Sequence, residues 1–136
     1  MSRTILVTGA TSGFGKAIAE LFAKNGYNVC ITGRRADRLD AIQAQLQQFG
    51  VKVYTSQFDI RDKKQVEAAI AKLMSEVDKI DILVNNAGLA AGMSSIEEGD
   101  TDDWDTMIDT NIKGLLYITR QIAPMMKERC SGHIIN

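Results

Sequence analysis

Three glycines near the amino terminus form the part of this sequence best suited to chemistry. Gly9, Gly13 and Gly15 follow the apolar run Ile5–Val7, which is typical of a strand buried on both faces. Apolar residues then recur at helical spacing over Lys16–Lys24. A strand, a glycine turn and a helix in that order direct backbone N–H groups and the positive end of a helix dipole to one place. This arrangement predicts a binding site for a phosphate or a pyrophosphate.

The spacing of the glycines distinguishes between kinds of phosphate-binding loop. A P-loop requires Gly-x-x-x-x-Gly-Lys-Ser/Thr, but the first glycine position holds Ala10 and the hydroxyl position holds Ala17. The common dinucleotide pattern Gly-x-Gly-x-x-Gly also fails, because the order here is Gly-x-x-x-Gly-x-Gly. From the loop alone, a tight turn without a ligand remains the alternative. The loop residues that we predict to bind a cofactor are Gly9, Ala10, Thr11, Ser12, Gly13, Phe14 and Gly15.

Two arginines follow the second predicted strand, Tyr27–Thr32. In NAD-binding units an acidic residue at this point, about 20 residues after the glycine loop, binds the ribose 2′-hydroxyl. Here Gly33 is followed instead by Arg34 and Arg35, and a guanidinium group can bind a 2′-phosphate with two hydrogen bonds. The sequence therefore predicts NADP(H) rather than NAD(H). A solvated basic turn is the alternative interpretation.

The third predicted strand, Val51–Gln57, ends in a pair suited to an adenine ring. The carboxylate of Asp59 can accept a hydrogen bond from the adenine amino group, and Ile60 can cover the ring. We therefore predict both as cofactor-binding residues. A turn or helix cap at Asp59 is the alternative.

A second polar motif follows the fourth predicted strand, Ile80–Val84, and reads Asn85-Asn86-Ala87-Gly88. Two carboxamides at the carboxyl end of a central strand can bind neighbouring backbone groups. Ala87 and Gly88 leave room for the ribose and nicotinamide of a cofactor. We predict Asn86, Ala87 and Gly88 as cofactor-binding residues.

The elements that must position these motifs alternate between strand and helix along the chain. Helices are predicted over about Gly13–Asn25 and Arg38–Phe49, and a third begins at Asp62, with Gln65 as its capping partner. A fifth strand begins at His133. This alternation predicts an α/β fold with a parallel sheet.

The longest irregular stretch, Leu89–Asp100, follows the fourth strand, where substrate contacts are expected. Thr101 is the predicted N-cap of the last helix. That helix is apolar around much of its circumference, so we expect it to be buried on more than one side, with Pro124 kinking it near its end.

Composition excludes several other classes of function. The chain has 136 residues, 45% of them hydrophobic, and a net charge of −1, which fits a soluble domain without an electrostatic footprint for nucleic acid or anionic membrane. No apolar run approaches the roughly 18 residues of a membrane span. Cys30 and Cys130 lack metal-ligand spacing, so we expect free thiols, a cytoplasmic protein and no metal site. The sole histidine, His133, is predicted to be non-catalytic.

The motifs together resemble those of the short-chain dehydrogenase/reductase family, particularly its NADP-dependent 3-hydroxy acid (serine/allo-threonine) dehydrogenases. The resemblance covers the whole chain and is carried by Thr8–Gly15, Gly33–Arg35, Asp81–Met93 and Asp103–Tyr117. It implies a Rossmann-like, doubly wound parallel sheet of order 3-2-1-4-5 between two helix layers. It also implies hydride transfer between NADP(H) and a hydroxy acid or its oxo acid, in a homo-oligomer such as the family's tetramer.

The same resemblance assigns a catalytic role to Asn111, whose backbone would help to hold a water molecule in a proton relay. A helix-bending asparagine is the alternative. The family's catalytic Ser, Tyr and Lys are expected beyond residue 136, because none of Tyr27, Tyr54 and Tyr117 has a lysine four residues later. Such a tyrosine acts as general acid, with the lysine lowering its pKa.

Residues 1–136 are accordingly expected to form a single dinucleotide-binding domain that is incomplete at its C-terminus, since family members are nearly twice as long. A sheet ending at this point would leave an open edge for another subunit or a further segment. Two rival functions remain: a non-catalytic NADP(H)-binding module or regulator, and a methyltransferase with a similar sheet. The methyltransferase is disfavoured by Arg34 and Arg35, where such enzymes usually carry an acid.

Overall fold

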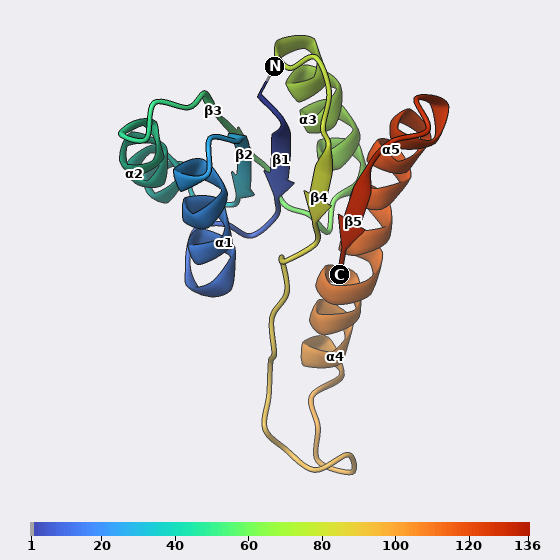
Figure 1. The fold of residues 1–136 in the computed structure, drawn as a ribbon. Coiled ribbons are helices and arrows are strands. Elements are labelled where there is room, and N and C mark those ends of the chain that lie inside the picture. The colour runs from blue at the N-terminus through green and yellow to red at the C-terminus, as the bar shows by residue number, and fades with distance from the viewer. Residues whose placement is uncertain (1) are drawn as a thin grey trace.

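Within residues 2–136, which the computed structural model describes, five strands form one sheet (Figure 1). The strands are β1 (Thr4–Val7), β2 (Asn28–Gly33), β3 (Val53–Gln57), β4 (Ile82–Val84) and β5 (His133–Ile135). Their order across the sheet is β3-β2-β1-β4-β5, and every neighbouring pair is parallel. The predicted parallel sheet of order 3-2-1-4-5 is therefore confirmed.

Helices cover both faces of this sheet (Figure 1). One face carries α1 (Gly13–Lys24) and α2 (Ala36–Gln47), and the other carries α3 (Lys63–Glu76) and α5 (Leu115–Glu128). Before α5, the chain forms α4 (Thr101–Ile108) and a π-helical turn, η1 (Asp109–Gly114), which extend beyond the carboxyl ends of the strands. Over the residues described, none of these helices has the length and apolar composition needed to cross a membrane.

The central strand shows how the sequence builds both layers. Ile5 and Val7 pack towards α1 and α2, whereas Leu6 packs towards α3 and α5, and all three side chains are completely buried. Successive side chains of a strand point to opposite faces, so an uninterrupted apolar run is what a strand covered on both sides requires. Burial of each such side chain contributes about 1.5–3 kcal/mol. The two cores together fix the carboxyl ends of the strands in space.

Strand boundaries differ from the predictions by two residues at two places. β3 begins at Val53 rather than Val51, and β4 begins at Ile82 rather than Ile80. The reason is pairing, because a strand extends only as far as its neighbours: Val53 pairs with Val29, and Ile82 pairs with Ile5. Apolar character alone does not mark where that ladder starts.

Asp62 is confirmed as the N-cap of α3, and the N-cap predicted for the last helix is wrong by one residue. Gln65 does not complete a capping box, because its side-chain oxygen accepts the N–H of Asp59 and the N–H of Asp62 donates to the carbonyl of Asp59. The Asp62 carboxylate accepts hydrogen bonds from the backbone N–H groups of Lys64 and Gln65. For α4, the side chain of Asp100 rather than Thr101 accepts the N–H of Asp102, at 2.8 Å. Aspartate and threonine are both favoured N-caps, so adjacent candidates of this kind cannot be ranked by residue type.

The last helix is also less buried and less regular than predicted. Ile108, Ile112 and Leu116 follow one another at four-residue spacing, and each is about half exposed, at 45%, 55% and 56%. The buried side carries Ile118 and Ile122 instead. Among the described residues the helix is therefore covered on one side only.

At Pro124, where a kink is expected, the helix is not interrupted. α5 continues through Pro124 to Glu128, and the helical hydrogen-bond pattern changes earlier, at η1. Proline removes an N–H donor but leaves the surrounding residues free to remain helical when packing holds them. Nothing in the hydrophobic spacing of this segment indicates the π-helical turn.

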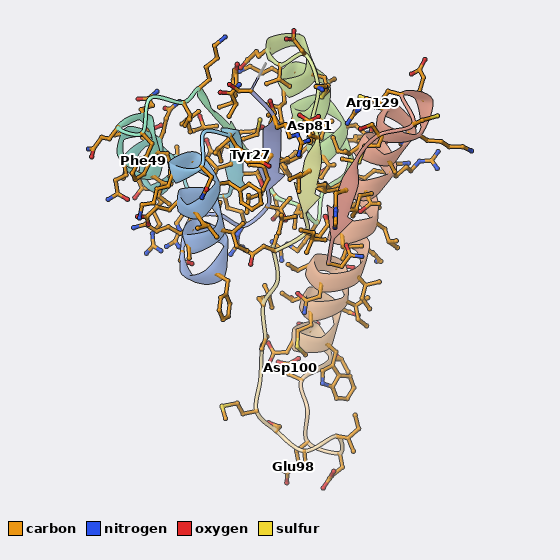
Figure 2. All side chains as sticks on the ribbon, in the orientation of Figure 1. Tyr27, Phe49, Asp81, Glu98, Asp100 and Arg129 are labelled. Carbon is orange, nitrogen blue, oxygen red and sulfur yellow. The ribbon has the colours of Figure 1, made fainter. Side chains whose placement is uncertain are left out.

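Charged residues gather at the amino ends of β1 and β4, where Figure 2 labels Asp81 and Arg129. The Asp81 carboxylate accepts the backbone N–H of Thr4 at 2.8 Å and lies 3.1 Å from the ammonium of Lys79. Burial, the largest single influence, favours the neutral acid. The Thr4 N–H, Lys79 and Arg129 together outweigh it, so the pKa of Asp81 lies below its ordinary value.

We expect this cluster to make the fold less stable in acid. A carboxyl whose pKa is lower in the folded chain stabilises the fold at pH values above its ordinary pKa of 3.8, and this contribution is lost as the pH falls through the lower folded value. The free energy of unfolding measured between pH 6 and pH 3 should therefore fall more steeply in the wild type than in Asp81→Asn. Parallel curves for the two proteins would contradict this assignment.

Candidate functional site

A cleft of about 400 Å³ lies at the carboxyl ends of the strands. It brings together most residues predicted to bind a cofactor, from four separate parts of the chain: Gly9, Thr11, Ser12, Phe14, Arg34, Arg35, Asp59, Ile60, Asn86, Ala87 and Gly88. The other predicted loop residues, Ala10, Gly13 and Gly15, do not belong to its lining. Ala10 is completely buried, and its N–H donates to the carbonyl of Thr32. Its part in the site is therefore to hold the loop against β2.

The glycine turn between β1 and α1 is packed too closely for side chains at two of its three glycines. Gly9 has a φ of +62°, and a Cβ atom there would lie 2.7 Å from the Cα of Ala87. A Cβ on Gly15 would collide with the side-chain amide of Asn86 and the carbonyl of Gly9. Both glycines thus permit backbone segments to approach one another, as a nucleotide-binding βα turn requires.

The third glycine borders open space. Gly13 begins α1 with a φ of +55°, and among the described residues no atom lies within 4 Å of the position its Cβ would take. The first intrahelical bond recorded at this end runs from Lys16 N to Ser12 O, at 3.3 Å. The N–H groups of Gly13, Phe14 and Gly15 thus precede the helical hydrogen-bond ladder. They are suited to an anionic group placed at the helix dipole's positive end.

The Asn86 motif ties the carboxyl end of β4 to the glycine turn. The side-chain amide of Asn86 donates to the carbonyls of Thr8 and Gly9, at 3.1 and 3.0 Å. In return, the hydroxyl of Thr8 accepts the N–H of Ala87 at 3.0 Å. The predicted bonding of a carboxamide to neighbouring backbone groups is therefore confirmed. These bonds hold two walls of the cleft at a fixed separation.

Asn85, in the same motif, points the other way. Its amide donates to the hydroxyl of Thr119 at 3.0 Å and to the side-chain oxygen of Asn136 at 2.8 Å. It therefore links β4 to α5 and to the end of β5 rather than to the cleft.

The two predicted arginines lie at the end of β2, on the rim of the same cleft. Arg34 and Arg35 are both exposed, and neither is part of an ion pair within residues 2–136. Arg35 is the N-cap residue of α2, with extended backbone and no side-chain capping bond. Two guanidinium groups without carboxylate partners are therefore available to an anion in the cleft.

Asp59 forms the turn that was its alternative interpretation, and its predicted contact with adenine stays a prediction. It lines the cleft beside Ile60, and its carboxylate also accepts the N–H of Arg61 at 3.0 Å, which forms a turn before α3. The Arg61 guanidinium is the largest cause of a pKa below the ordinary value for Asp59, and the charge of Arg34 acts in the same direction.

Six lining residues were not predicted as site residues from the sequence: Thr32, Gly33, Phe58, Arg61, Leu89 and Thr110. The hydroxyl oxygen of Thr110 is buried and has no hydrogen-bond partner among residues 2–136. An orphaned buried hydroxyl at the wall of a cleft is consistent with a polar ligand there. Thr110 directly precedes Asn111, and Arg61 follows Asp59 by two residues, but neither spacing indicates the direction of a side chain.

Asn111 lies behind the cleft and holds its wall. Its side-chain oxygen accepts the N–H of Leu89, and its amide donates to the carbonyl of Leu89, both at 2.8 Å. It lies within η1, so the long helix is joined at its irregular turn to the start of the loop that follows β4. The loop then runs away from the sheet, with Glu98 near its tip in Figure 2.

Over residues 2–136, no three or more His, Cys, Asp or Glu side chains form a group that can hold a metal ion. His133 is exposed at the start of β5 and does not line the cleft.

Curated relatives resemble the chain along its whole length. It is 50% identical over 132 residues to the NADP-dependent 3-hydroxy acid dehydrogenase YdfG of Salmonella typhi, a match that covers 97% of this chain and 52% of that protein. It is 49% identical over 136 residues to the serine 3-dehydrogenase of Rhizobium radiobacter, covering 100% and 53% of the two chains. The chain thus spans about half the length of the curated relatives it matches.

Solved structures show the same architecture. A serine dehydrogenase from Escherichia coli matches with a TM-score of 0.90 and 48% identity, covering 98% of this chain and 60% of that one. A closed form of serine dehydrogenase complexed with NADP+ matches with a TM-score of 0.91 and 48% identity, covering 98% and 52%. The family model for short chain dehydrogenase matches residues 3–136. With its parallel sheet, glycine turn and carboxyl-end cleft, the chain belongs to the short-chain dehydrogenase family.

Proposed function

We propose that this chain binds NADP(H) in the cleft, as part of an oxidoreductase that acts on a 3-hydroxy acid such as serine or allo-threonine. The observation that carries the proposal is the presence of Arg34, Arg35 and the glycine turn on one cleft. Two groups of relatives are named NADP-dependent 3-hydroxy acid dehydrogenase and serine 3-dehydrogenase, and these activities support both the proposed cofactor and the proposed substrate class. We further propose that residues 1–136 belong to a single dinucleotide-binding domain.

We propose that each segment lining the cleft binds a different part of the cofactor. The turn from Gly9 to Gly15, including Ala10, Thr11, Ser12, Gly13 and Phe14, would receive the pyrophosphate at the start of α1. Arg34 and Arg35 would bind the 2′-phosphate, and Asp59 and Ile60 the adenine. Asn86, Ala87 and Gly88 would lie against the ribose and nicotinamide. The open space at Gly13 fits this occupant.

Hydride transfer between the nicotinamide and the carbon that bears the substrate hydroxyl is the chemistry that the cofactor supplies when bound. The chain's own residues hold the walls of the cleft in place around the cofactor. Asn111 fixes Leu89, so the loop that leaves the cleft starts from a set position. We also propose that the backbone of Asn111 helps to hold a water molecule in a proton relay. The π-helical turn supports this role, because such turns alter the carbonyl bonding pattern and are frequent at functional sites.

The exposed apolar row on the last helix supports a proposal about assembly, and the two free thiols support one about compartment. The apolar row Ile108, Ile112 and Leu116 on the last helix supports a homo-oligomer, in which a second copy of the chain would cover it. Cys30 is buried, which raises its pKa to about 12, and Cys130 is exposed; both are free thiols. Free thiols support a reducing compartment, and we propose the cytoplasm.

The proposal is tested by comparing the affinities of the intact protein for NADPH and NADH. We expect NADPH to bind at least about tenfold more tightly, because each charge-assisted bond to the 2′-phosphate contributes on the order of 1–2 kcal/mol at an exposed site. Quenching of protein fluorescence on titration gives both dissociation constants. Equal affinities would overturn the NADP(H) assignment.

A further inference from the structure

One carboxylate on the cleft is engaged by a guanidinium that has no role in the proposal above. The Asp59 carboxylate accepts three bonds from the side chain of Arg61: Nε to Oδ1 at 3.0 Å, Nε to Oδ2 at 3.1 Å, and Nη2 to Oδ2 at 2.7 Å. The two side chains are 26% and 36% exposed, so the pair is only partly hydrated. Engagement of both carboxylate oxygens by one guanidinium fixes the orientation of the two groups.

This ion pair lies on the same cleft as the arginines of β2. Arg34, Arg35, Asp59 and Arg61 all contribute to its lining, and the pKa of Asp59 responds to the charge of Arg34 as well as to Arg61. A phosphate monoester carries a charge of roughly −1.5 to −2 at neutral pH. An unpaired carboxylate at this place would repel it and oppose the attraction of Arg34 and Arg35.

Asp59 has a structural reason to remain at this position. Its Oδ1 accepts the backbone N–H of Arg61, its own N–H donates to the side chain of Gln65, and its carbonyl accepts the N–H of Asp62. These bonds form the turn between β3 and α3. The carboxylate therefore belongs to the local fold, and its charge must be balanced if an anion is to bind nearby.

We propose that Arg61 is a positioning residue for nucleotide selectivity: by pairing with Asp59 it cancels a negative charge beside the 2′-phosphate site, so that the cleft favours NADP(H). This role rests on the proposed function. It acts through Asp59 and requires no contact between Arg61 and the phosphate. Asp109, whose charge also reaches Arg61, is itself paired with Lys113 at 2.7 Å and does not compete for the guanidinium.

The first variant is Arg61→Gln, which removes the guanidinium and leaves the turn bonds of Asp59, since these come from backbone atoms and Gln65. We expect the dissociation constant for NADPH to rise about tenfold while that for NADH changes less than about twofold, because NADH lacks the repelled group. The ratio of the two constants is the readout, and it is insensitive to general loss of adenine binding. The difference from wild type should shrink in 1 M salt, where charges are screened within about 3 Å.

The second variant separates charge cancellation from direct phosphate binding. In Asp59→Asn/Arg61→Gln both charges are absent, so we expect the NADPH-to-NADH ratio to return to within about threefold of wild type. A matched control, Arg120→Gln, removes an exposed arginine on α5 that does not line the cleft and should leave the ratio unchanged. Circular dichroism confirms that each variant is folded.

Two outcomes overturn the role of Arg61 without affecting the proposed function. In the first, Arg61→Gln keeps the wild-type preference for NADPH. In the second, the double variant binds NADPH as weakly as Arg61→Gln does. The second outcome would mean that Arg61 binds the phosphate itself. A wild-type protein with no preference for NADPH would overturn the proposed function, and the role of Arg61 with it.

Discussion

Replacing Arg34 and Arg35 together with alanine is expected to weaken NADPH binding on the order of a hundredfold while leaving NADH binding nearly unchanged. Both guanidinium groups lie on the rim of the cleft and lack carboxylate partners within residues 2–136. Two charge-assisted contacts to a dianionic group, discounted for their exposure, account for about 2.7 kcal/mol. Calorimetric titration of both nucleotides measures the change.

Two further variants sharpen this experiment. Arg34→Lys/Arg35→Lys keeps the positive charges but loses the planar guanidinium groups that can bind a phosphate with two hydrogen bonds. We therefore expect an NADPH affinity between that of the wild type and that of the alanine variant. Arg120→Ala serves as the control for removing an exposed positive charge elsewhere. Similar losses for NADPH and NADH in the alanine variant would show that the arginines support the fold or the shared half of the dinucleotide instead of the 2′-phosphate.

Gly9→Ala is expected to destabilise the fold by about 3 kcal/mol or more, the largest effect we anticipate from a single added methyl group. The new Cβ would lie 2.7 Å from the Cα of Ala87 and 3.1 Å from its N, and these backbone atoms are held by the bond between Ala87 and Thr8. The left-handed φ of +62° adds strain. Equilibrium unfolding in urea measures the loss.

Gly50→Ala provides the matched comparison. Gly50 also has a left-handed backbone, with a φ of +74°, but no atom among the described residues lies within 4 Å of its Cβ position. We expect a loss of about 1–2 kcal/mol from conformation alone. The difference between the two variants isolates the crowding against Ala87, and equal losses would refute the close packing of the two turns.

Much of the fold could be predicted because its determinants are local. The apolar run of β1, the glycine turn and the carboxamide after β4 each depend on neighbouring residues, and the family resemblance supplied the strand order. Asn86 illustrates why part of the site could also be predicted from the sequence. A carboxamide at the carboxyl end of a central strand has backbone carbonyls within hydrogen-bonding distance.

The features that escaped prediction depend on long-range packing or on the direction in which a side chain points. The spacing of Ile108, Ile112 and Leu116 marks an apolar face but does not say whether anything covers it. The π-helical turn contains Asn111, which bonds to Leu89 from a distant part of the sequence, and nothing in the local residue pattern indicates this contact. Arg61 was missed because residue type and spacing do not show that its side chain turns back to Asp59.

The stretch after β4 is held at both of its ends by side-chain hydrogen bonds. Asn111 secures Leu89 at one end, and Asp100 starts α4 at the other by accepting the N–H of Asp102. Residues 90–99 can therefore change in length and composition while the nucleotide cleft keeps its dimensions. If the cleft binds a dinucleotide as proposed, mutations in this one segment can alter neighbouring contacts without disturbing that cleft.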